Sequence, residues 1–295
     1  MTTRPTGQQP LLPQDKDTAK TQSIFKAVNV FLGAPVTWLP IEGTGTTNAL
    51  FRTHLPGQPL VLRLSADDTQ AFGVNRQSEA DVLTLIQGYD WAPRVLHNDW
   101  QAGWCLMSDH GISPKPQESR SYTPLLLQAV RQWQQIITGP CFDYPALYQR
   151  YRDLFAGQKN SVWIALLERL ESINQALPEV PECLTHHDLH RGNLCLDDGR
   201  LVVLDWEYAG IGNPWFDAAA LNRQFGISVE DIANLPAWQA LSPTDFKTGL
   251  ILSLWHTEAL ENLWYAARER GTDIDSDRIS QAKRLLDYSL PFPEP

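Results

Sequence analysis

Asp188, Asn193 and Asp205 are the residues of this 295-residue chain whose types and spacing could perform chemistry. Asp188 precedes Asn193 in a loop that also carries histidine, arginine and glycine. One carboxylate can accept the proton of a substrate hydroxyl, while an asparagine oxygen and a second carboxylate can hold Mg²⁺. Phosphoryl transfer from ATP to an alcohol needs this combination of groups.

A β-hairpin is the element that must position these groups. The apolar runs 194–196 and 201–204 flank Asp197-Asp198-Gly199, a sequence typical of a tight turn between two strands. The hairpin places Asn193 at its entrance and Asp205 at its exit, which are the same end of the ribbon. If the second strand continues, alternation also puts Glu207 on the face of Asp205, where it could add to the metal site or face a substrate amine. The alternative for Glu207 is a salt bridge with an arginine.

The spacing His186-x-Asp188-x-x-x-x-Asn193, followed by Asp205, resembles the catalytic and metal loops of the protein-kinase-like fold. The continuation Asp-Trp-Glu-Tyr-Ala-Gly at 205–210 is similar to the choline/ethanolamine kinase and thiamine kinase branch of the aminoglycoside phosphotransferase-like superfamily. This resemblance implies an α+β fold of two lobes, with a small antiparallel-sheet N-lobe, a mostly helical C-lobe and ATP between them. It also implies that Asp188 is the catalytic base, that Asn193 and Asp205 ligate Mg²⁺, and that Asp217 braces the catalytic-loop backbone.

A nucleotide-binding region is predicted upstream. The residues with which it would bind the cofactor are Gly43, Thr44, Gly45, Thr46, Asn48, Arg63, Glu79, Met107 and Asp109. The glycine/threonine turn at 43–46, between two expected strands, can cover phosphates with its backbone N–H groups. The alternative is an ordinary hairpin turn, which would have the same sequence pattern. By resemblance, Arg63 replaces the phosphate-binding lysine of protein kinases and pairs with Glu79, which is otherwise a solvated helix carboxylate. The stretch from Met107 to Gly111 would be the hinge.

The domain boundaries follow from the expected elements. Residues 1–20 are predicted to be a disordered tail, 21–107 the nucleotide-binding N-lobe, and 108–295 the helical, catalytic and substrate-binding C-lobe. The expected strands include 60–64, 91–96 and 104–107. Helices are expected at 21–32, from Thr123 as N-cap, and at 147–155, 162–177 and 245–270.

A pocket for a cationic substrate could be built from Trp206, Tyr208, Trp215, Trp255, Glu258 and Tyr265. Trp255, Glu258 and Tyr265 share one face of a long helix, and aromatic faces beside a carboxylate attract cations. Ordinary helix packing with a bonded polar group is the alternative.

Composition limits the partners. A net charge of −10 argues against a nucleic-acid-binding surface, and no apolar run reaches membrane-spanning length. The 4 scattered cysteines indicate reduced thiols and a cytoplasmic protein. The oligomeric state stays open.

The sequence therefore predicts an ATP- and Mg²⁺-dependent enzyme that phosphorylates an alcohol of a small, cationic metabolite of the choline, ethanolamine or thiamine type. An aminoglycoside or aminosugar phosphotransferase is the near alternative, which the 206–210 run disfavours. A non-catalytic nucleotide-binding module is the other, and such a module would not need the base Asp188.

Overall fold

The computed structural model describes residues 18–41, 48–55, 57–66, 72–157, 162–197, 199–269 and 275–290. The chain divides into two compact units, of which the first contains Met1–Ala66 and Arg94–Asp109 and the second contains Asp67–Pro93 and His110–Pro295. The segment 67–93, expected in the N-lobe, therefore groups with the second unit. Its helix α2 (Arg76–Leu85) explains this, because Val82 and the following Ile86 are fully buried in the core of that unit.

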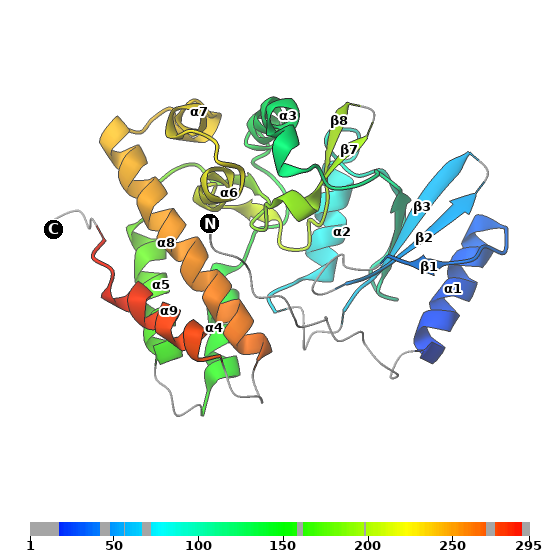
Figure 1. The fold of residues 1–295 in the computed structure, drawn as a ribbon, viewed down its shortest axis with the longest axis horizontal. Coiled ribbons are helices and arrows are strands. Elements are labelled where there is room, and N and C mark those ends of the chain that lie inside the picture. Colours follow the sequence, from blue (N-terminus) through cyan, green and yellow to red (C-terminus); the bar gives the residue numbers. More distant parts are fainter. Residues whose placement is uncertain are drawn as a thin grey trace. The chain divides into compact units, whose positions relative to one another are not determined.

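The first unit is an antiparallel sheet with one helix packed on it. The strands are β1 (Leu39–Pro40), β2 (Ala49–Leu55), β3 (Gln58–Leu64), β4 (Val95–Asp99) and β5 (Trp104–Ser108), in the order β1-β2-β3-β5-β4. Strands β1, β2 and β3 are drawn in blue in Figure 1. Along β3, Leu60, Leu62 and Leu64 alternate onto one face and form a core with Ile24 and Val28 of α1 (Thr18–Leu32). The expected antiparallel sheet is thus confirmed.

Two boundaries in the first unit differ from prediction. Helix α1 begins at Thr18, inside the expected tail, because its apolar stripe packs against the sheet. The strand expected from Trp91 begins only at Val95. Trp91 instead belongs to the core of the second unit, where its ring stacks on that of Tyr89 at 4.9 Å.

The second unit is mainly helical. Its longer helices are α2, α3 (Ser119–Trp133), α4 (Tyr144–Phe155), α5 (Val162–Ala176), α6 (Trp215–Phe225), α8 (Pro243–Arg268) and α9 (Ser276–Asp287), with the short α7 (Val229–Ala233) after α6. Its described residues also form two small antiparallel ribbons: β6 (Cys183–Thr185) with β9 (Gly210–Gly212), and β7 (Leu194–Asp197) with β8 (Arg200–Val203). The β7–β8 pair is the predicted hairpin.

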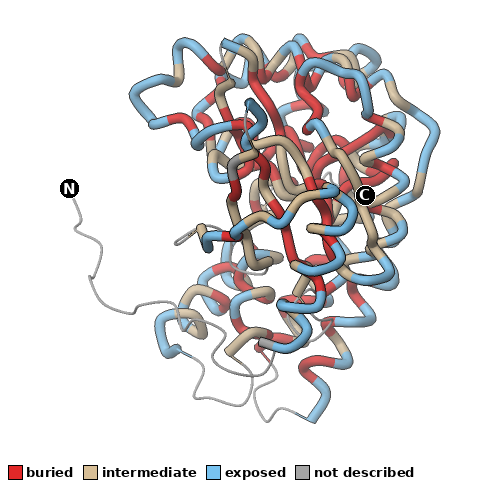
Figure 2. The backbone as a smooth tube through the Cα atoms, turned by 90° about the vertical axis from the view of Figure 1, so that its right-hand side faces the viewer, coloured by how far each residue is buried: buried red, intermediate tan, exposed pale blue. Residues whose placement is uncertain are grey.

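One large core of buried apolar side chains holds these helices together. Figure 2 shows the buried stretches of the backbone in red. Helix α3 was expected to start at Thr123 but begins at Ser119, with Pro124 inside it. The fully buried Tyr122 and Leu126 lie in this core, so their burial favours extending the helix beyond the local capping signal. In the described ranges, no helix combines the length and the apolar character needed to cross a membrane.

Candidate active site

The loop that carries Asp188 is held by a buried carboxylate, that of Asp217 at the start of α6. Its two oxygens accept hydrogen bonds from the main-chain N–H of His186 at 3.0 and 3.2 Å and from that of His187 at 3.1 Å. The indole N–H of Trp133 donates to the same carboxylate at 3.2 Å. His187 has a φ of 64°, a left-handed conformation that is costly for a non-glycine residue, and these bonds stabilise it. The predicted bracing role of Asp217 is confirmed.

Asp188 and Asn193 meet across the loop. The Asn193 side-chain N–H donates to the main-chain carbonyl of Asp188 at 2.9 Å and to its carboxylate at 3.4 Å. His190 Nε2 lies 3.8 Å from the same carboxylate. Because the Asn193 nitrogen is committed to Asp188, its Oδ1 is the atom left to ligate a cation.

The pKa of the predicted base, Asp188, is raised. Burial, and after it the negative charge of Glu207, raise its pKa to about 7, while the bond from Asn193 acts in the opposite direction. The side chain still keeps 42% of its surface exposed, so water and a bound cation would both moderate this shift. A carboxylate with a pKa near neutrality can accept a proton from a hydroxyl group and release it again.

The second predicted metal ligand, Asp205, lies at the same end of the hairpin as Asn193. Strand β8 ends at Val203, and the Leu204 N–H donates to the Asn193 carbonyl at 2.7 Å. Asp205 itself has a φ of 61°, so the chain turns sharply there instead of continuing as a strand.

The buried His186 connects the two loops. Its Nδ1 accepts the N–H of Asp188 at 3.3 Å, so its Nε2 carries the proton and donates to the Leu204 carbonyl at 2.9 Å. Burial lowers the pKa of His186 to about 4, which keeps the imidazole neutral. His186 thus connects Leu204, the residue before Asp205, to the loop that carries Asp188.

The donor set of this end of the hairpin suits Mg²⁺. Asn193 and Asp205 offer amide and carboxylate oxygens, which are hard ligands, and Mg²⁺ commonly takes only one or two carboxylates and completes its shell with water and phosphate. Within the described residues no three His, Cys, Asp or Glu side chains gather in a metal-binding group, so a ligand shell supplied by the protein alone is not found there.

Glu207 is buried and forms an ion pair with Arg76 of α2, whose Nη1 lies 3.0 Å from Glu207 Oε2. Strand alternation would place Glu207 on the same face as Asp205 only if the second hairpin strand continued through both residues. Strand β8 ends at Val203, so this argument does not apply. The alternative predicted for Glu207, a salt bridge with an arginine, is present. A role of Glu207 as a metal ligand stays a prediction.

The predicted nucleotide-binding residues are only partly described. Gly43, Thr44, Gly45 and Thr46 lie outside the described residues. In the first unit, Asn48 accepts the Ala66 N–H at 3.2 Å, buried Arg63 lies in β3, Met107 lies opposite Val61, and Asp109 forms an ion pair with Arg52 at 2.5 Å. Glu79 belongs to the second unit, where its carboxylate lies 3.6 Å from Arg76. The pairing of Glu79 with Arg63 stays a prediction.

Trp206, Trp215 and Trp255 are packing residues in this structure. They are 0%, 0% and 5% exposed, and each indole N–H donates to a main-chain carbonyl. A ring without exposed surface cannot stack on a ligand unless the core rearranges, so these three rings do not support the predicted cation pocket. The partly buried Tyr208 lies in the turn after Glu207 and remains a candidate.

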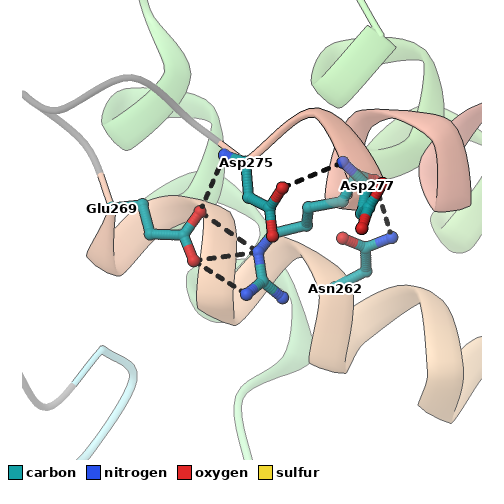
Figure 3. A network of polar contacts seen from close by, with 5 residues as sticks. Asn262, Glu269, Asp275 and Asp277 are labelled. Atoms are coloured by element: carbon teal, nitrogen blue, oxygen red, sulfur yellow. Dashed lines mark hydrogen bonds and ion pairs between the residues drawn. The ribbon is translucent and has the colours of Figure 1, made fainter. Parts of the chain in front are cut away.

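Glu258 and Tyr265 have partners from α9. Gln281 donates to Glu258 at 3.2 Å, and the Arg278 guanidinium lies 4.6 Å from the centre of the Tyr265 ring. Arg278 also donates to Glu269 at 2.7 Å in the network that connects α8 with α9 (Figure 3). This arrangement agrees with the alternative prediction, helix packing with bonded polar groups.

Sequence reasoning missed one contact to the catalytic loop. The Tyr144 hydroxyl, from α4, is hydrogen-bonded to His187 Nε2 at 2.6 Å and accepts the Asn213 N–H at 2.8 Å. Neither the helical pattern around Tyr144 nor its residue type marks this role, because the partners are separated by 43 and 69 positions.

Two solved structures share the fold of this chain. Choline kinase LicA from Streptococcus pneumoniae superposes with a TM-score of 0.71 and 17% identity, covering 91% of this chain and 99% of that one. A structure of LicA in complex with AMP gives a TM-score of 0.68 at 18% identity, covering 90% of this chain and 96% of that one. The fold is therefore that of the protein-kinase-like phosphotransferases, as predicted.

The model of the phosphotransferase enzyme family, APH, matches residues 37–248, and the chain belongs to this family. It is 24% identical over 213 residues to ethanolamine kinase 2 of Mus musculus, which is 65% of this chain and 55% of that protein. It is 25% identical over 184 residues to the thiamine kinase of Escherichia coli, which is 60% of this chain and 63% of that protein. The chain thus spans less than two thirds of these relatives' own length. These matches confirm the predicted resemblance to the choline/ethanolamine kinase and thiamine kinase branch of the aminoglycoside phosphotransferase-like superfamily.

Proposed function

We propose that this chain transfers the γ-phosphoryl group of ATP to the hydroxyl of a small, cationic amino alcohol or thiamine-like alcohol. The observation that carries the proposal is the single constellation of Asp188, Asn193 and Asp205 at one end of the β7–β8 hairpin, braced by Asp217. A bracing network of this kind holds a base and two oxygen ligands in a fixed relation before substrate arrives.

In the proposed reaction, Asp188 orients the substrate hydroxyl and accepts its proton as the oxygen bonds to the γ-phosphorus and the bond to ADP breaks. Asn193, through Oδ1, and Asp205, through its carboxylate, would hold Mg²⁺, which supplies charge neutralisation for the phosphates when it is bound. Assignment of the ATP phosphates to Arg63 and the 43–46 loop remains part of the proposal. The structure of LicA in complex with AMP supports a nucleotide as the donor.

The preference for a cation rests on the charge around the base. Burial and, after it, the carboxylates of Glu207 and Glu261 raise the pKa of Asp188, and each glutamate also forms an ion pair with an arginine, Arg76 or Arg223. An ammonium group bound beside Asp188 would be attracted by the same charge. The named activities of the relatives, on ethanolamine, thiamine and choline, point to the same substrate class.

A turnover assay tests the proposal directly. Phosphorylation of choline, ethanolamine, thiamine and an aminoglycoside would be measured with ATP and Mg²⁺, using the wild type, D188N and D197N. Asp197 is a matched control, because it lies in the same hairpin at its far end. We expect turnover of a cationic alcohol that D188N abolishes and D197N retains. Equal activity of D188N and the wild type would remove Asp188 as the base.

A neutral isostere tests the charge preference. Choline would be compared with 3,3-dimethylbutan-1-ol, which replaces the quaternary nitrogen by carbon. We expect kcat/KM to fall at least about tenfold, equivalent to about 1.4 kcal/mol. Equal kcat/KM for the two alcohols would refute the cationic substrate while leaving phosphoryl transfer in place. Preference for the aminoglycoside would favour the antibiotic-modifying branch.

A further inference from the structure

Arg76 stands between two buried carboxylates of the second unit. Its Nη1 lies 3.0 Å from Glu207 Oε2 and 3.6 Å from Glu79 Oε2. The side chains of Glu207 and Glu79 are only 4% and 2% exposed, and that of Arg76 is 15% exposed. Removing one partner of an ion pair this well shielded from water costs much more than removing one partner of a surface pair, because it leaves a buried charge uncompensated.

Helix α2, which carries Arg76, is held in place by its N-cap and by its buried apolar side chains, independently of the ion pair with Glu207. Asn75 caps α2 by accepting the Ser78 N–H at 3.1 Å, so Arg76 is the first residue of a well-defined helical turn. Further along, Val82 and Ile86 are fully buried in the core of the second unit. Arg76 therefore presents its guanidinium from a rigid support.

Glu207 belongs to a short turn whose first residue is the predicted metal ligand. Asp205 has a φ of 61°, Trp206 is enclosed in the core with its N–H on the Val203 carbonyl at 2.9 Å, and the Ala209 N–H closes the turn on the Trp206 carbonyl at 3.0 Å. Two contacts hold this turn in place: the burial of the Trp206 ring in the core, and the ion pair between Glu207 and Arg76. The strained conformation of Asp205 persists only while its surroundings determine it.

We propose that Arg76 is a positioning residue for the metal site: by holding Glu207 it fixes the turn from which Asp205 binds Mg²⁺. The inference rests on the proposed function. Without Arg76, the buried Glu207 carboxylate loses the 3.0 Å ion pair that holds it to α2, and the turn relaxes. Asp205, two residues away, then loses its alignment with Asn193, and affinity for a divalent cation falls.

Three variants separate positioning from general stability. R76M removes the charge, and R76K keeps one charge but replaces the guanidinium, whose Nη1 contacts both carboxylates, by an ammonium of different shape and reach. V82A is the matched control on the same helix, because it opens a cavity in the core that anchors α2 without touching the ion pairs. Should R76M fail to fold, R76K decides the question.

The readout is binding of Mn²⁺ to the protein with AMP-PNP, followed by electron paramagnetic resonance, with the melting temperature measured in parallel. We expect the Kd for Mn²⁺ to rise at least tenfold in R76M and severalfold in R76K, while V82A lowers the melting temperature and keeps the wild-type Kd. A wild-type Kd in R76K, or an equal loss of affinity in V82A, would overturn the positioning role. If the wild type itself binds no Mn²⁺ with AMP-PNP, the metal assignment of the proposed function fails, and the inference fails with it.

Discussion

Replacing Gly212 with alanine should disturb the catalytic loop through Tyr144. A Cβ atom on Gly212 would lie 2.8 Å from the Tyr144 hydroxyl and 3.0 Å from Cε1 of His187. Both distances are shorter than ordinary van der Waals contact, so the hydroxyl and the imidazole must move. They are the two groups of the 2.6 Å hydrogen bond that supports the residue preceding Asp188.

The magnitude follows from the contacts that are lost. Overpacking by one methyl group costs about 1–3 kcal/mol. Displacing the hydroxyl weakens its bonds to His187 and to the Asn213 N–H, worth about 0.5–1.5 kcal/mol each. Alanine regains about 0.5–1 kcal/mol because it restricts the unfolded chain more than glycine does. The expected net loss is about 2–4 kcal/mol of unfolding free energy, and kcat should fall at least about tenfold because His187 adjoins the base.

Chemical denaturation followed by tryptophan fluorescence measures this loss, and steady-state kinetics with the best alcohol measures kcat. Y144F supplies the control, because it removes the hydroxyl that the new methyl group meets. In the Y144F background, G212A should cost about 1–2 kcal/mol less than in the wild type, a coupling typical of residues in contact. Strictly additive losses, or a G212A variant with wild-type stability and kcat, would refute the steric reasoning.

Further predictions concern the metal ligand, the buried histidine and the helix core. D205N should abolish turnover and Mn²⁺ binding without changing the far-ultraviolet circular dichroism, and retained activity would remove the metal assignment. Burial lowers the pKa of His256 to about 3, below an unfolded value near 6.5, so the free energy of unfolding should fall as the pH drops below about 6.5, by up to about 1.4 kcal/mol per pH unit. H256Q should remove this part of the slope, whereas Y148F, which loses the 3.1 Å bond to His256, should lower stability but keep the slope; an unchanged slope in H256Q contradicts the argument. G249A would put a Cβ within 2.3 Å of the Trp215 ring, so it should destabilise the protein by about 1–3 kcal/mol in thermal unfolding, despite the better helix propensity of alanine.

The parts of the candidate site that could be predicted from the sequence are those formed by residues close together along the chain. The Asp-Gly turn and the apolar runs predicted the β7–β8 hairpin, and a hairpin brings its two open ends together whatever surrounds it. Asn193 and Asp205 therefore had to be neighbours. Asp188 lies only 5 positions from Asn193, so the side-chain contact between them is also short-range.

Helix boundaries were harder to predict from the sequence, because the burial of apolar side chains can outweigh the preference of capping residues for a helix start. Thr123 and Pro124 form a good helix start, yet α3 begins at Ser119 because Tyr122 gains more from the core than the capping signal offers. Likewise, a helical stripe containing Trp255, Glu258 and Tyr265 cannot reveal whether it faces a ligand or another helix. The structure gives them partners from α5 and α9: Arg169 lies over the Trp255 ring, while Gln281 and Arg278 contact Glu258 and Tyr265.

The supports of the site were decided by tertiary structure alone. Arg76 and Glu207 are 131 positions apart, and Trp133 and Asp217 are 84 apart. No periodicity or turn signal specifies such pairs, since each arises only when the core brings distant helices and loops together. The sequence by itself determined the hairpin and the acidic and amide groups at its open end, to which the proposed phosphoryl transfer is assigned. The packed core decided which side chains hold that hairpin and its loops in place, because buried charges and strained backbone persist only where surrounding contacts compensate them.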